Sequence, residues 1–122
     1  MASICNFKFS STMVLDGEEE KTEFIAKGYK DFSDEGVIYY FKHENSYKFY
    51  IKNEVLTVNV NDSVYVFDKS KKTEAIINNA GYSYKASVKT NELMISEEKI
   101  VLEYVMDFVN FKGIYKIILE LL

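Results

Sequence analysis

The sequence predicts an all-β protein that folds as a single antiparallel up-and-down β-barrel of about eight or more strands. From Cys5 onward, apolar or aromatic residues occupy every second position in short segments. Polar clusters interrupt these segments roughly every 8–12 residues, which is the spacing typical of β-sandwiches and barrels. Because successive strand side chains point to opposite faces of a sheet, this alternation allows one face to be buried while the other meets water.

The composition indicates one domain over residues 1–122, with enough apolar and aromatic residues (48% and 16%) to exclude disorder. The net charge is −4, and every cation other than the one histidine is a lysine, which disfavours the bidentate phosphate recognition that arginine performs best. The chain shows no signal peptide, no disulfide framework and no apolar span of about 20 residues. We therefore expect a soluble, cytoplasmic protein that does not associate with membranes.

The opening hairpin has a clear inward face. Its first segment places these residues on one side: Cys5, Phe7, Phe9, Ser11 and Met13. An acidic turn is predicted over residues 16–20, which begin with Asp16-Gly17. The second segment carries Thr22, Phe24, Ala26 and Gly28 on one face. The small residues at 26 and 28 predict a bend or a close approach of the backbone.

Shorter strands are predicted in the middle of the chain. Residues 37–41 are apolar on both faces, so the pattern does not decide which side points inward. The clearest hairpin joins residues 46–52 to 56–60 through a tight turn at Asn53. Further strands are predicted over residues 64–67, 73–77, 82–88 and 91–95, separated by Asn-, Asp-, Gly- and Ser-containing turns.

Two long strands are predicted to close the chain, joined by a connection at residues 110–113. The first has Glu103 and Asp107 outward and these residues inward: Ile100, Leu102, Tyr104, Met106 and Phe108. The last segment, 114–122, matches a helical template as well as strand alternation. We favour a strand because the segment is short for an amphipathic helix, is rich in isoleucine and lacks an N-cap. Its apolar residues on both faces predict that another part of the chain or a second subunit covers it.

Several strand segments, taken in order, resemble those of a known family. They are Gly36-Val37-Ile38-Tyr39-Tyr40-Phe41, Lys52-Asn53-Glu54-Val55-Leu56, Gly81 leading into Lys89-Thr90, Leu102-Glu103-Tyr104-Val105-Met106-Asp107 and Ile117-Ile118-Leu119-Glu120. In these segments and their order the chain resembles the YwiB-like family of small bacterial proteins with a calycin-like β-barrel and no established function, and the resemblance covers essentially the whole chain. The resemblance implies a lipocalin-like barrel topology in a cytosolic protein, and it carries over no catalytic residue.

The residues themselves predict no catalytic site, no metal site and no cofactor. His43 is the only histidine and Cys5 the only cysteine, so the nitrogen and sulfur ligands that zinc prefers are lacking. We expect His43 at a loop edge and Cys5 as a small core residue. The acidic pairs that could hydrolyse glycosides are all expected in solvated turns: Glu18 to Glu20, Asp34-Glu35 and Glu97-Glu98. A non-enzymatic protein is therefore predicted.

The barrel interior is the best candidate for a binding site. Barrels of about eight strands are either filled by side chains or hold one small ligand. An apolar lining with several hydroxyl groups suits a small apolar or amphipathic molecule. The residues predicted to line it are Phe24, Phe49, Tyr65, Phe67, Tyr84, Tyr104 and Met106. The same side chains could also form a solid core, and the sequence leaves both possibilities open.

Two other binding functions compete with this one. The apolar C-terminal strand could form a protein interface or a homodimer. Single-stranded nucleic acid could stack on aromatic residues that alternate with lysines, at Phe7-Lys8-Phe9, Tyr47-Lys48-Phe49-Tyr50 and Tyr82-Ser83-Tyr84-Lys85. Because alternation sends these lysines to the opposite face, we expect the aromatic rings in the core. With the negative net charge, this makes nucleic acid an unfavoured partner.

Overall fold

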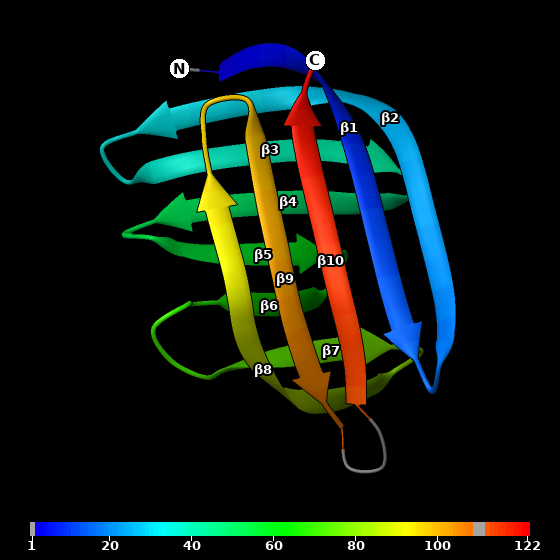
Figure 1. Ribbon diagram of the computed structural model, residues 1–122. Helices are drawn as coiled ribbons and strands as arrows, with labels where there is room; N and C mark the ends of the chain where they lie inside the picture. The colour runs from blue at the N-terminus through cyan, green and yellow to red at the C-terminus, as the bar shows by residue number, and fades with distance from the viewer. Residues whose placement is uncertain (1, 109–111) are drawn as a thin grey trace.

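The residues that the structure describes, 2–108 and 112–122, form ten antiparallel strands in the closed barrel of the computed structural model (Figure 1). Each strand pairs with its neighbours in the sequence, and the last strand pairs with the first. This confirms the predicted up-and-down barrel. The strands are β1 (Ala2–Leu15), β2 (Glu18–Ser33), β3 (Gly36–His43), β4 (Asn45–Lys52), β5 (Val55–Val60), β6 (Ser63–Phe67), β7 (Thr73–Asn79), β8 (Tyr82–Ile95), β9 (Lys99–Asp107) and β10 (Lys112–Leu121). No helix able to cross a membrane occurs in the described part of the chain.

Several hairpins turn on only two residues, both in the left-handed conformation. The φ angles are 51° and 79° at Asp16-Gly17, 52° and 65° at Asn53-Glu54, and 50° and 82° at Ala80-Gly81. Positive φ at both positions matches the turn to the twist of the flanking strands. The acidic turn predicted over residues 16–20 is therefore too long. Because two residues complete the turn, β2 already begins at Glu18.

The C-terminal segment is a strand, as predicted. β10 is hydrogen-bonded to β1 on one side and to β9 on the other. Its alternation buries Ile117 and Leu119 and leaves Ile114 exposed. Of the connection predicted at residues 110–113, Asn110 and Phe111 lie outside the described residues, whereas Lys112 and Gly113 belong to β10.

Two long strands bend and connect the two halves of the barrel. In Figure 1, β1, β9 and β10 run steeply in front, β3 to β7 run across behind them, and β2 and β8 curve from one group to the other. β2 begins to pair with β3 at Gly28, which lies opposite Phe41. A Cβ atom at Gly28 would overlap the carbonyl oxygen of Tyr40. The close backbone approach predicted from the small residues of this segment is confirmed.

The inward faces of the strands form an apolar core rich in aromatic rings. Tyr39 and Phe41 are buried, which settles the inward side of residues 37–41. The Phe41 ring stacks on Phe7 and Phe49, with centroid distances of 5.3 and 5.9 Å. The largest side chains that are fully buried are Phe7, Phe41, Phe49, Phe67, Leu56, Ile100, Leu102, Leu119 and Val88.

Replacing Gly28 by alanine is expected to lower the free energy of unfolding by about 2 kcal/mol or more, because the added methyl group must displace the β3 backbone. Urea denaturation followed by circular dichroism measures the change. Gly81→Ala is the control, since nothing lies within 4 Å of its Cβ position and only its positive φ makes alanine unfavourable, at about 1 kcal/mol. Equal losses in the two variants would contradict the close approach.

Candidate functional site

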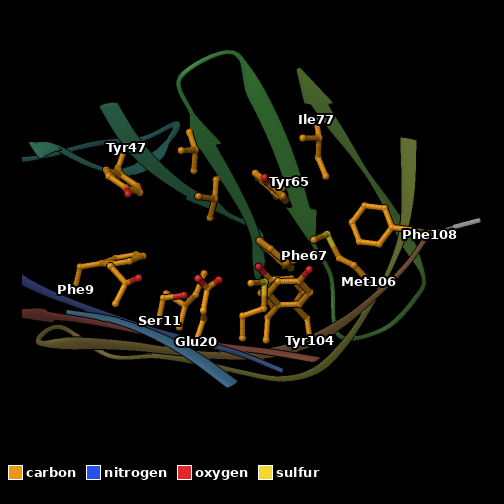
Figure 2. A pocket seen from close by; sticks show the side chains of 16 residues that line it. Phe9, Ser11, Glu20, Tyr47, Tyr65, Phe67, Ile77, Tyr104, Met106 and Phe108 are labelled. Carbon is orange, nitrogen blue, oxygen red and sulfur yellow. The ribbon is translucent and has the colours of Figure 1, made fainter. Parts of the chain in front are cut away.

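One end of the barrel interior is hollow. A cavity of about 380 Å³ lies there, near the turn between β1 and β2, the turn between β5 and β6, and the end of β9. Figure 2 shows Ser11, Glu20 and Tyr104 on one side of it, with Tyr47, Tyr65 and Ile77 on the side across. The full lining is Phe9, Ser11, Met13, Glu20, Thr22, Tyr47, Val58, Val60, Tyr65, Phe67, Ile77, Tyr104, Met106, Phe108, Tyr115 and Ile117. The barrel is thus solid in one half and open in the other.

Four of the residues predicted to line the interior do line this cavity: Tyr65, Phe67, Tyr104 and Met106. The other three lie elsewhere. Phe49 is fully buried in the solid half, Phe24 is half-buried beside the Phe9 ring, and the Tyr84 side chain is 52% exposed. Alternation predicts the face on which a side chain lies, but it does not predict the depth along the barrel axis.

Three of the four tyrosines in the lining, each from a different strand, have a raised pKa and give the cavity much of its polar character. The rings of Tyr104 and Tyr115 stack with a centroid distance of 4.9 Å and an interplanar angle of 7°. Burial raises the pKa of Tyr104 well above its ordinary value of 10.0, and the charges that Tyr65 and Tyr115 would carry raise this pKa further. Burial also raises the pKa of Tyr65 and of Tyr115. These hydroxyl groups therefore stay neutral at physiological pH and can donate or accept hydrogen bonds.

Glu20 adds a carboxylate to the lining. It lies opposite Met13 in the pairing of β1 with β2, and Thr22 lies opposite Ser11. Figure 2 shows Glu20 beside Ser11. Glu18 to Glu20 are exposed, as expected, but they do not form a turn, because β2 starts at Glu18. The signal was present in the sequence, since Glu20 continues the inward alternation of Phe24 and Thr22.

The residues considered for catalysis or metal binding lie in other surroundings. The His43 side chain is exposed, and its ring stacks on Phe24 with a centroid distance of 4.2 Å. Cys5 packs against the core, and its thiol donates a hydrogen bond to the carbonyl oxygen of Ser3 at 3.6 Å. Glu103 pairs with Lys116 at 3.3 Å. Within the described ranges, no three His, Cys, Asp or Glu residues gather closely enough to hold a metal ion.

The aromatic residues that alternate with lysines fall into two groups. Phe7, Phe9 and Phe49 are buried, as expected from alternation. For Tyr82 and Tyr84 the expectation of a core position is wrong, because their side chains are 68% and 52% exposed. The start of β8 pairs only with β7, and pairing with β9 begins at Ser87, so this hairpin extends past the neighbouring strand.

The comparisons with known proteins show the fold and nothing finer. The crystal structure of the ywiB protein from Bacillus subtilis superposes with a TM-score of 0.73 at 17% sequence identity, covering 98% of this chain and 92% of that chain. No family model matches the sequence, and no curated protein matches it. The resemblance seen in the order of the strand segments is therefore confirmed for the fold.

Removing the Tyr104 hydroxyl is expected to change how stability depends on pH. The pKa of Tyr104 is higher in the folded protein than in the unfolded chain, so the unfolded state loses this proton first as the pH rises. Stability is therefore full below about pH 10 and falls above it. Tyr104→Phe should lose less stability than the wild type between about pH 9 and 11, measured by urea unfolding at each pH.

The matched control is Tyr84→Phe, which removes a hydroxyl outside the cavity lining. This variant should lose as much stability as the wild type between about pH 9 and 11, because Tyr104 is still present. A loss in Tyr104→Phe equal to that of the wild type would show that burial of this hydroxyl does not affect its ionisation.

Proposed function

We propose that this protein binds a small apolar or amphipathic molecule in the barrel cavity and acts as a non-enzymatic binding protein of the cytosol. The observation that supports it best is a cavity of about 380 Å³ whose walls combine buried apolar side chains with neutral hydroxyl groups. Sites for small molecules typically measure about 300–1,000 Å³ and have this mixture of a mostly apolar lining and a few polar groups.

The apolar walls provide the driving force. The side chains of Phe9, Val58, Phe67, Met106 and Ile117 line the cavity, and each is at most 8% exposed. Apolar ligand surface that leaves water against such walls contributes about 25 cal/mol for each Å². A ligand with an aliphatic or aromatic body is therefore favoured over a sugar or a nucleotide.

The hydroxyl groups provide orientation. Tyr65, Tyr104 and Tyr115 reach the cavity from β6, β9 and β10, and Ser11 and Thr22 reach it from β1 and β2. A polar ligand group that enters the cavity needs such partners, because an unpaired polar group costs about 1–3 kcal/mol when it is buried. An amphipathic molecule fits this lining better than a pure hydrocarbon.

The fold is compatible with this use. Lipocalin-like barrels hold one small ligand in the interior. Membership of the YwiB-like family and the calycin-like classification belong to the same proposal, with the structural likeness and the order of the strand segments as support. The non-enzymatic role is supported by the surroundings of His43 and Cys5, which pack on Phe24 and on the core.

Blocking the cavity should abolish binding. Ile77→Trp places a larger ring in the lining, and we expect the affinity for a bound hydrophobic fluorophore to fall by at least about tenfold because the ring occupies the ligand's space. Fluorescence titration with 1-anilinonaphthalene-8-sulfonate and with its uncharged parent, N-phenyl-1-naphthylamine, measures the affinity.

Ile76→Trp is the matched control, since Ile76 is the adjacent residue of β7, is 40% exposed and is absent from the lining. This variant should bind like the wild type. Equal affinity in both tryptophan variants, or no binding of either fluorophore by the wild-type protein, would refute the cavity as the site.

A second candidate is self-association through the outer face of β10. Because both edges of β10 are already paired, a dimer would have to use this face. Ile114 is 55% exposed there and lies in register between Val14 and Val105, which makes a short apolar row. Light scattering at high concentration should then show a dimer for the wild type and a monomer for Ile114→Lys. A strictly monomeric wild type would exclude this candidate.

A further inference from the structure

We propose that the cavity prefers amphipathic amines, with the ligand's ammonium group held by Glu20 and its apolar body held by the aromatic walls. The inference rests on the proposed function and names the chemical class of its ligand. It is carried by the placement of one carboxylate in a lining that otherwise consists of apolar and hydroxyl-bearing side chains.

Glu20 is positioned to meet a cation. Its place on β2 continues the inward face of Thr22 and Phe24, and it lies across from Met13 of β1. The residue is exposed, so it marks the solvent-accessible part of the cavity. Ser11 lies beside it in Figure 2, and Thr22 follows on the same face. An ammonium group carries only donors, and these three side chains all offer oxygen acceptors.

No cation among the described residues is paired with this carboxylate. Within the described residues, Glu20 makes no ion pair, and the lysine pairs that the structure contains involve Glu23, Glu103 and Asp107. The described lining includes neither lysine nor histidine. A carboxylate ligand would therefore bring a like charge close to Glu20 with no compensating cation in the lining, and like charges repel. Fatty acids are therefore less favoured ligands than amines of the same chain length.

The aromatic walls favour a cation for a second reason. A ring attracts a positive charge placed over its face within about 6 Å, and the effect increases when the cation is desolvated. Tyr47, Tyr65 and Phe108 line the cavity from β4, from β6 and from the residue after β9. An amine that enters past Glu20 thus comes close to aromatic rings, whose faces attract a cation and repel an anion.

The described turns at this end of the barrel add negative charge. The turns at residues 16–17, 44, 61–62 and 80–81 contain Asp16, Glu44 and Asp62 and no lysine, and Lys112 at the start of β10 is paired with Asp107 at 3.8 Å. A rim with one sign of charge raises the local concentration of the opposite ion and speeds its association. The rim therefore favours a cation before it reaches Glu20.

Three probes with the same carbon chain test the inference: octylamine, octanol and octanoate. At neutral pH the first is a cation, the second is uncharged and the third is an anion. Calorimetric titration of the full chain should rank their affinities as octylamine, then octanol, then octanoate. In Glu20→Gln the advantage of octylamine over octanol should fall by about threefold to fivefold, the size expected for an ion pair that water can reach.

Glu19→Gln is the matched control. It removes the same charge from the preceding residue of β2, and Glu19 is not part of the lining. It should keep most of the advantage of octylamine. Glu20→Lys should reverse the order and favour octanoate over octylamine, which tests the site by a gain of affinity that a merely unfolded variant could not show.

The outcomes separate this inference from the proposed function. If octanol binds as tightly as octylamine, or if Glu19→Gln and Glu20→Gln reduce the preference equally, the preference for amines at Glu20 is refuted and the apolar binding site stands. If none of the three probes binds, both the proposed function and the inference are refuted.

Discussion

The pairing of β1 with β10 is the constraint on which the rest of the structure depends. It extends from Phe7 opposite Leu121 to Leu15 opposite Gly113, and it joins the two ends of the sheet. Without it, β1 and β10 would each expose a row of unpaired backbone N–H and C=O groups, and both edges of the sheet would be open to pairing with other chains. With it, the sheet closes into a barrel that has an interior. Every second residue of each strand then faces one shared interior, which is what makes both a core and a cavity possible.

The interior is filled unevenly because the inward side chains differ in size along the strands. At one end, large rings meet, as in the stack of Phe41 on Phe7 and Phe49. Toward the turn between β1 and β2, small side chains such as Ser11, Thr22 and Val60 lie among the larger rings of the lining. Ser11 and Thr22 also supply hydroxyl groups to the lining.

The bend of β2 links the fold to the cavity. Gly28 lets β2 pass close to the backbone of β3, so that the first part of the strand pairs with β1 alone while the last part pairs with both neighbours. Because of this arrangement, residues 18–27 are free of β3 and form a wall at the open end of the barrel. Glu20 and Thr22 belong to this wall. Pairing with β1 alone places Glu20 opposite Met13 and Thr22 opposite Ser11.

The sequence alone determined the class of fold, the number and order of most strands and the inward face of several of them. Alternation is a local property: whether Phe7 or Lys8 faces inward follows from the period of the strand, and the structure agrees. The C-terminal strand was favoured for similar local reasons and was confirmed. The inward side of residues 37–41 was not decided, because both faces there are apolar and only the neighbouring strands distinguish them.

Only the tertiary structure decided which inward residues surround empty space. Tyr65 and Phe49 are both aromatic and both face inward, yet one lines the cavity and the other lies in the solid half. Depth along the barrel depends on the register of all ten strands together, and no single segment contains that information. The positions of Tyr84 and Glu20 also could not be predicted from their own segments. The end of a hairpin leaves the tyrosine in solvent, and a two-residue turn brings the glutamate into the wall.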